Sequence, residues 1–272
     1  MAKSKKTSDS DQPNSRTNGS SKTDGSTEPQ EETPIEFLAS LASVLVTGLF
    51  IITFILQAFE IPSGSMEDTL LIGDHVFVNR VQFAPAAGEL GKLLPYRNPH
   101  HDEVVVFVSP VQPGLFLVKR LIGVPGDHLR LREGVVYRNG EKLAEPYTKH
   151  APPDDRSPYL NNFPSVPPEG YGVTADWSIA QSQFVENGEL VVPPGHYFAM
   201  GDNRDNSYDG RYWGFIPQEN LIGRPMFIYW SFETPDGQYK QNAFLDRVKF
   251  FLHTALHFFD QTRWRRTLKV VR

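Results

Sequence analysis

The chain has 272 residues, a length that suits one large domain or two modest ones. Its 39% hydrophobic and 12% aromatic content can bury a core, which excludes a wholly disordered protein. A net charge of −5 argues against a general nucleic-acid binder. The absence of cysteine excludes disulfides, thiolate metal sites and cysteine nucleophiles, so nucleophilic catalysis would need Ser, Thr, Lys or a carboxylate.

Residues 1–36 are predicted to form a disordered polar tail, because 1–33 contain no Leu, Ile, Val, Phe, Trp or Tyr. Residues 37–59 carry no charge. As a helix they would be about 35 Å long at ~1.5 Å per residue, enough to cross a bilayer. The alternatives are a buried core helix and a cleaved signal peptide, whose apolar region usually has only about 7–15 residues. We therefore predict a single transmembrane helix over 37–59.

The orientation of this span follows from the distribution of positive charge. Five lysines and arginines precede the span, and none follows it before Arg80. An excess of Lys and Arg marks the cytoplasmic side, so the N-terminus is expected inside the cell.

Residues 60–247 are predicted to form a β-rich ectodomain. Short β-branched and apolar runs alternate with Gly and Pro, as expected of strands and turns. The expected strands are His75–Asn79, Glu103–Val108, Phe116–Ile122, Gly134–Tyr137, Leu190–Val192, Tyr197–Met200 and Met226–Trp230. Residues 144–188 hold seven prolines and interrupt this pattern as an insertion, either a surface subdomain or a flexible flap.

Residues 248–272 are predicted to form an amphipathic, basic C-terminal helix. A phenylalanine-rich stretch is followed by five lysines and arginines. Such a helix could close the core or lie on a lipid surface, and the basic end beside aromatic residues favours the lipid surface. His253 and His257 lack the HExxH context, so no metal site is expected there.

Three motifs carry residues suited to catalysis. Ser65 stands in Ile61-Pro62-Ser63-Gly64-Ser65-Met66, directly after the apolar span, where an ordinary Ser/Gly turn is the alternative. Lys119 stands in the apolar run 116–127, and burial would lower its pKa enough to make it a base; a solvated lysine is the alternative. The run 201–214, Gly-Asp-Asn-Arg-Asp-Asn-Ser-Tyr-Asp-Gly-Arg-Tyr-Trp-Gly, suggests a hydrogen-bonded loop and lacks the glutamate of a calcium loop.

Together, in this order behind an apolar span, the three motifs resemble those of bacterial type I signal peptidases, the leader peptidases. The resemblance covers about residues 37–230 and implies a mainly β fold, a signal-peptidase-like catalytic domain behind one N-terminal transmembrane helix. Ser65 would then be the nucleophile and Lys119 the general base. Ser63 would help bind the oxyanion, and Ser207 would orient the lysine amine.

The same resemblance assigns further residues. Asp202, Asp209, Arg211 and Arg120 would support the loop structurally, and Phe59, Ile61 and Val118 would line pockets for small side chains of the substrate. It implies a serine endopeptidase that removes signal peptides from secreted preproteins without a metal or cofactor. The enzyme would sit in the bacterial cytoplasmic membrane, N-terminus inside and catalytic domain on the outer face. Its partners would be signal peptides, membrane lipid and the protein-export machinery, with no nucleic acid.

Two other functions stay open from the sequence. One is a self-cleaving Ser-Lys protease, against which the membrane span weighs. The other is a membrane-tethered β-domain that only binds proteins. The presence of Ser65, Lys119 and Ser207 gives no support to a loss of activity.

Overall fold

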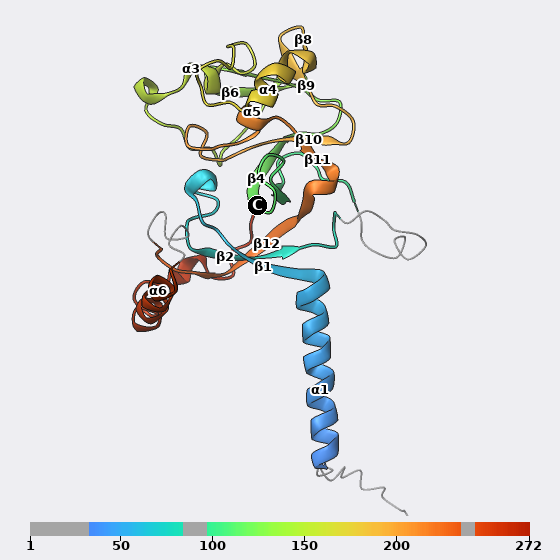
Figure 1. Cartoon of the computed structure of the whole chain (residues 1–272), viewed down its shortest axis with the longest axis vertical. Coiled ribbons are helices and arrows are strands. Elements are labelled where there is room, and N and C mark those ends of the chain that lie inside the picture. Colours follow the sequence, from blue (N-terminus) through green and yellow to red (C-terminus); the bar gives the residue numbers. More distant parts are fainter. Residues whose placement is uncertain (1–32, 84–96, 235–242) are drawn as a thin grey trace, which may run out of the picture. The chain divides into compact units, whose positions relative to one another are not determined.

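The computed structural model describes residues 33–83, 97–234 and 243–272, and the chain divides into two units, 1–45 and 46–272 (Figure 1). Helix α1 (Pro34–Phe50) begins at a reciprocal cap. The Glu36 carboxylate accepts from the Thr33 backbone N–H at 2.9 Å, and the Thr33 hydroxyl accepts from the Glu36 N–H at 3.3 Å. Most of the predicted tail, 1–32, lies outside the described residues.

The helix ends earlier than the sequence predicts. A short π-helical turn, Ile51–Ile55, follows α1, and Leu56–Glu60 form strand β1. The prediction of a helix as far as residue 59 was wrong because an uncharged run does not distinguish a buried helix from a strand. Residues 56–60 form a strand because they pair with β2 (Asp74–Asn79), with Leu56 opposite Asn79 and Glu60 opposite His75.

A seven-stranded antiparallel sheet forms the base of the larger unit, in the order β1-β2-β12-β3-β4-β10-β11. Its other strands are β3 (Val104–Val108), β4 (Phe116–Gly123), β10 (His196–Met200), β11 (Ile216–Pro217) and β12 (Leu221–Ser231). Strand β3 shows why the sheet is stable. Val104 and Val106 pack in one hydrophobic cluster, whereas Val105 and Phe107 pack in another, so both faces of the strand are covered.

A smaller antiparallel sheet has the order β7-β6-β5-β9-β8. Its strands are β5 (His128–Arg132), β6 (Val135–Arg138), β7 (Glu141–Lys142), β8 (Val185–Glu186) and β9 (Glu189–Val191). The two sheets confirm the predicted mainly β fold. Strands β1, β5, β7, β8 and β11 were not among the strands expected from the sequence, and β7, β8 and β11 have only two residues each.

The proline-rich insertion is a packed subdomain and not a flap. It contains the short helices α3 (Pro158–Asn161) and α4 (Ala175–Ala180). Tyr159, Phe163 and Trp177 are buried against residues of β5, β6 and β10 in one hydrophobic cluster. A further short helix, α5 (Gly210–Trp213), follows β10. The Asp209 side chain caps the N-terminus of α5 by accepting a hydrogen bond from the Arg211 N–H.

The C-terminal segment also differs from the predicted helix over 248–272. Helix α6 runs from Phe244 to Leu256, and the residues after it form turns, isolated bridges and a short 3-10 helix, Trp264–Arg266. Arg266 explains the change, because its guanidinium donates to the buried carboxylate of Asp74 at 3.1 and 2.5 Å. Val271 is also buried against the first sheet, so the chain leaves the helix to reach these partners. Helix α6 itself buries none of its side chains.

Candidate active site

Ser65 lies on a single 3-10 turn, Gly64–Met66, that connects β1 to β2. Met66 and Leu70 are almost fully buried in the cluster beneath the first sheet, and they fix the turn to the domain. Ser63 precedes the turn in an extended conformation and is exposed. The Ser65 side chain is therefore held by a short, well-anchored segment.

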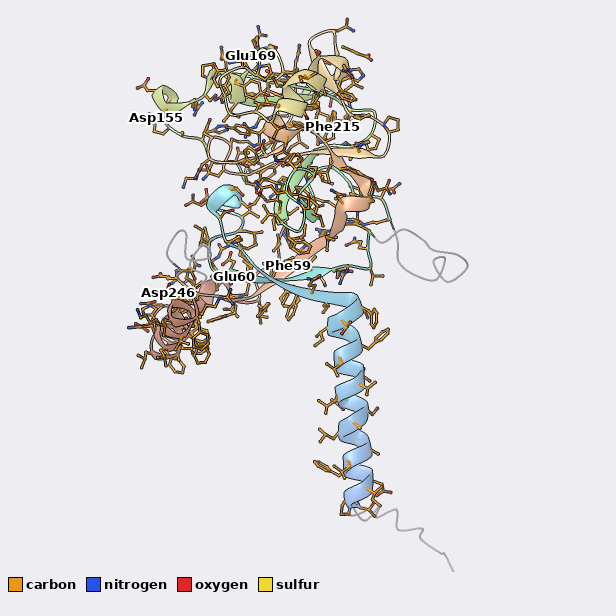
Figure 2. The ribbon with its side chains drawn as sticks, in the orientation of Figure 1. Phe59, Glu60, Asp155, Glu169, Phe215 and Asp246 are labelled. Atoms are coloured by element: carbon orange, nitrogen blue, oxygen red, sulfur yellow. The ribbon has the colours of Figure 1, made fainter. Side chains whose placement is uncertain are left out.

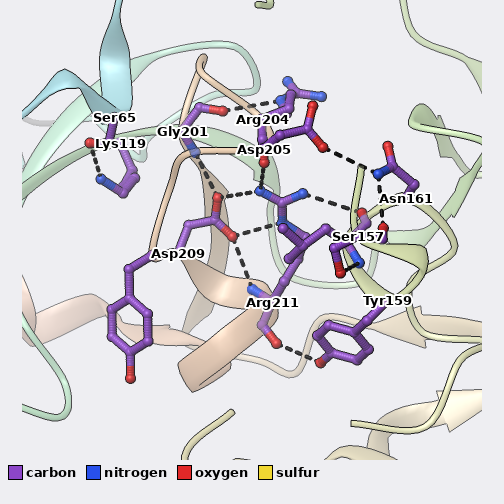
Figure 3. Close-up of polar contacts among 12 residues, drawn as sticks. Ser65, Lys119, Ser157, Tyr159, Asn161, Gly201, Arg204, Asp205, Asp209 and Arg211 are labelled. Atoms are coloured by element: carbon purple, nitrogen blue, oxygen red, sulfur yellow. Dashed lines mark hydrogen bonds and ion pairs between the residues drawn. The ribbon is translucent and has the colours of Figure 1, made fainter. Parts of the chain in front are cut away.

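Lys119 lies on β4, and its side chain is only 3% exposed. Its Nζ donates to Ser65 Oγ at 2.6 Å and to the Val118 carbonyl at 3.1 Å (Figure 3). Burial lowers the pKa of Lys119 to about 8, although the negative charges of Asp209 and Asp202 raise it in part. A lysine with this pKa is neutral in about a tenth of the molecules at pH 7 and in about half at pH 8, and the neutral amine can accept the serine proton.

The loop after β10 holds the serine turn through hydrogen bonds from Asn203. The Asn203 backbone N–H donates to the Ser65 carbonyl at 3.1 Å, and the Asn203 amide donates to the Gly64 carbonyl at 3.3 Å. The approach at Gly201 is so close that an added Cβ would lie 2.4 Å from the Ser65 carbonyl oxygen and 2.2 Å from Ser207 Oγ. Only glycine fits this position without moving the nucleophile.

Two buried ion pairs brace this loop. Arg120 binds Asp202 through two hydrogen bonds of 2.8 and 2.7 Å. Arg211 binds Asp209 through bonds of 2.9 and 2.8 Å, and Asp209 also accepts from the Gly201 N–H (Figure 3). All four side chains are at most 1% exposed. The structure thus brings together the four residues that the resemblance assigned to loop support.

A cavity of about 330 Å³ opens beside the Ser-Lys pair. Phe59, Ile61 and Val118 line it together with Ser65 and Lys119. Leu115 and Phe116, which were not among the pocket residues expected from the sequence, add to its apolar wall, and the Phe116 ring meets the Phe59 ring edge-on at 5.3 Å. The cavity is therefore mainly apolar where it adjoins the nucleophile.

Comparison with known proteins assigns this arrangement to a family. The family model described as signal peptidase, peptidase S26, matches residues 34–230. The chain belongs to this family. A signal peptidase I of Pseudomonas aeruginosa is 33% identical and covers 74% of each chain. The probable signal peptidase I-2 of Synechocystis sp. is 32% identical, covering 74% of this chain and 76% of its own.

A solved signal peptidase I structure from Enterococcus faecalis is 29% identical and covers 47% of this chain and 97% of its own. Its TM-score of 0.30 adds nothing to the description of the fold. Family membership makes the chain a serine endopeptidase. Among the described residues, one helix, Pro34–Ile55, is long and apolar enough to cross a membrane, which fits a membrane-anchored peptidase.

Ser207 of the peptidase does not make the expected hydrogen bond to the lysine amine. Its hydroxyl is buried and has no hydrogen-bond partner among the described residues. Lys119 instead donates to Ser65 and to its own preceding carbonyl group. The orienting role of Ser207 therefore stays a prediction.

Residues 145–149, at the start of the insertion, form a clasp that the sequence did not predict. Glu145 binds the buried Arg204 guanidinium through bonds of 2.9 and 2.5 Å. The Tyr147 ring lies 3.7 Å from the Arg120 guanidinium carbon. Lys149 N–H donates to the Asp202 carbonyl, and the Lys149 carbonyl accepts from Arg204 N–H, each at 2.9 Å. The clasp therefore ties the insertion to the catalytic loop.

Proposed function

We propose that this membrane-anchored peptidase removes N-terminal signal peptides from secreted preproteins, with Ser65 as nucleophile and Lys119 as general base. The observation that carries the proposal is the 2.6 Å contact between Ser65 Oγ and the buried Lys119 Nζ. Buried lysine is an established base for a serine nucleophile.

The catalytic sequence needs only these side chains, the nearby backbone and water. Neutral Lys119 takes the Ser65 proton as Oγ attacks the scissile carbonyl. The resulting ammonium then protonates the leaving amine, which leaves an acyl-enzyme ester on Ser65. Lys119 next activates a water molecule that hydrolyses the ester and releases the serine. The Ser65 N–H and the exposed Ser63 hydroxyl are the candidates that stabilise the oxyanion.

Substrate selection follows from the strands around the cavity. Strand β1 is at the edge of its sheet, and β10 pairs only with residues 120–123 of β4. The β10-facing side of residues 116–119 can therefore accept an extended peptide through main-chain hydrogen bonds. The apolar wall formed by Phe59, Ile61 and Val118 suits small side chains, as in the A-x-A-like sites where secretory signals are cut.

The proposed location is the bacterial cytoplasmic membrane, with the N-terminus inside and the catalytic domain on the outer face. The excess of lysine and arginine before the span supports this orientation. It would place the cavity on the side where a translocated cleavage site emerges, within reach of the protein-export machinery.

Cleavage of a preprotein with an Ala-x-Ala site, in detergent, tests the proposal. Wild type is expected to cut after the second alanine, and Ser65→Ala and Lys119→Ala to lose at least about 10³-fold in kcat/KM. Ser182→Ala and Lys142→Ala are matched controls, because both side chains are exposed and outside the site. An inert wild type, or an active Ser65→Ala, would favour a tethered binding domain instead.

A further inference from the structure

Helix α6 carries an apolar surface that the rest of the described chain leaves uncovered. None of its side chains is buried. Its six exposed large apolar side chains are each at least 39% exposed: Phe244, Leu245, Val248, Phe251, Leu252 and Leu256. At about 100° per residue these positions fall on one face of the helix. The helix therefore directs a continuous apolar stripe outward. Figure 2 draws the side chains of α6 around the labelled Asp246.

The opposite face of α6 is the one that contacts the domain. The rings of Phe250 and His253 lie 6.4 and 6.2 Å from the ring of Phe232, which is buried beside the first sheet. Arg247 and Lys249 are exposed at the two borders of the apolar stripe. The helix is amphipathic in the unusual sense that its more apolar side faces away from the protein.

Aromatic contacts connect the segment after α6, and through Phe232 the domain-facing side of α6, to strand β2. The Trp264 ring contacts Phe258 at 5.6 Å, and Phe258 contacts Trp230 at 6.0 Å. The row continues from Trp230 over His75 and Tyr229 to Phe77. Phe77 is on β2, the neighbour of β1, and β1 directly follows the helical segment that ends at Ile55.

The charge of this segment complements an anionic surface. Residues 244–272 contain seven lysines and arginines against two aspartates, in a chain whose net charge is −5. Arg266 is engaged with Asp74, but Lys249, Arg265 and Lys269 are exposed. An apolar stripe bordered by cations, with aromatic rings beside it, is the composition of a helix that lies in a membrane interface.

We propose that the apolar face of α6, together with Trp264, lies in the headgroup region of the anionic bilayer that holds the helix Pro34–Ile55. The peptidase would then contact its membrane twice, through the span and through this interfacial helix. The segment lies beyond residues 34–230, which the family model matches, so the second contact is a feature of this chain's C-terminal part. It rests on membrane anchoring and not on the Ser-Lys chemistry.

Site-specific spin labelling tests the contact in the full chain. Because the protein has no cysteine, Ala255→Cys places a single nitroxide within the exposed apolar face of α6. Glu169→Cys, exposed on the proline-rich insertion, is the matched control. Both would be reconstituted in vesicles of phosphatidylethanolamine and phosphatidylglycerol. Power saturation with oxygen and a water-soluble nickel chelate should place the residue-255 label about 5–10 Å below the phosphates and the residue-169 label in water.

Two outcomes would overturn the proposal. One is a residue-255 label as accessible to the nickel chelate as the residue-169 label. The other is shielding that appears only at high protein density, with spin–spin broadening, because a second copy of the chain would then cover the face.

A pair of substitutions gives an independent readout. Leu252 and Ile179 are both exposed aliphatic residues, at 55% and 74%, but only Leu252 is on the apolar face of α6. Leu252→Asp should move the residue-255 label into water, whereas Ile179→Asp should leave its depth unchanged. Neither residue touches the dyad, so both variants should cleave a short soluble peptide within twofold of wild type. An unchanged label depth in Leu252→Asp would contradict a lipid contact.

Discussion

At the scale of single residues, the active site depends on one lysine whose charge the fold removes from water. Lys119 is 3% exposed, and burial lowers its pKa to about 8 against the opposing field of two carboxylates. Arg120 and Arg211 partly neutralise those carboxylates through buried pairs. The ion pairs therefore limit how strongly Asp202 and Asp209 stabilise the ammonium form, besides holding the loop.

The pH dependence of cleavage should report this lysine. The protonated amine cannot accept the Ser65 proton, so kcat/KM should fall as the pH drops through about 8, with about a tenth of the molecules in the neutral form at pH 7. Lys119→Arg should be inactive throughout, because arginine stays protonated. A profile from pH 6 to 10 on a substrate without titratable groups would check this. A flat profile between pH 6.5 and 9 would rule out Lys119 as the base.

Gly201→Ala should lower kcat by about 10²-fold although residue 201 has no chemical role. The new methyl group would meet the Ser65 carbonyl oxygen at 2.4 Å, so the nucleophile or the loop must shift. A displacement of about 1 Å commonly costs ~10² in rate. Gly48→Ala, where the added methyl meets nothing within 4 Å, is the control. Equal kcat values for the two variants would show that the turn tolerates the shift.

At the scale of elements, the catalytic constellation is assembled from four segments that meet around one loop. The turn after β1 supplies Ser65, and β4 supplies Lys119. The loop after β10 contributes the carboxylates of both buried ion pairs. The clasp 145–149 closes the arrangement through Glu145 and Tyr147. The insertion is thus part of the framework of the active site as well as a packed subdomain.

Glu145→Gln should loosen this framework. Arg204 is 2% exposed, so removing the negative charge of its partner leaves a buried guanidinium uncompensated, at a cost of about 3–5 kcal/mol in folding free energy. Chemical denaturation measures the change, and kcat should fall with it because Arg204 belongs to the catalytic loop. Glu141→Gln, at an exposed position on β7, should change stability by less than about 0.5 kcal/mol. Equal stability of the two variants would show that the clasp contributes nothing.

At the scale of the whole molecule, the chain combines a membrane helix with a β-rich peptidase domain. The helix raises the effective concentration of the active site at membrane-inserted substrates. Its sequence continues without a charge into β1, the edge strand beside the cavity. The tether is therefore short, and the cavity begins within a few residues of the end of the helix.

Deleting residues 1–55 should separate the two contributions. Cleavage of a membrane-inserted preprotein in vesicles should fall by about 10²-fold or more, because the intramolecular advantage of anchoring is lost. Cleavage of a short soluble peptide should change little, since the deletion ends before β1 begins. Comparing kcat/KM for both substrates checks the expectation. Equal losses would indicate that the deletion damages the fold.

The amino-acid sequence alone determined the residue types and the local runs that carry the chemistry. Ser65, Lys119 and the loop from Gly201 were recognisable because each lies in a short motif. Five of the seven strands of the main sheet, β2, β3, β4, β10 and β12, were predictable at least in part from short β-branched and apolar runs between Gly and Pro, and the apolar span from its uncharged length.

Only the tertiary structure decided the features that depend on partners distant in the chain. The end of the first helix at Ile55 requires pairing of β1 with β2, and the end of α6 accompanies the binding of Arg266 to Asp74, 192 positions away. The Glu145–Arg204 pair has no local signature, because its free energy comes from burial that the fold creates. Likewise, the lowered pKa of Lys119 is a property of its buried surroundings, since a lysine in water keeps its ordinary value.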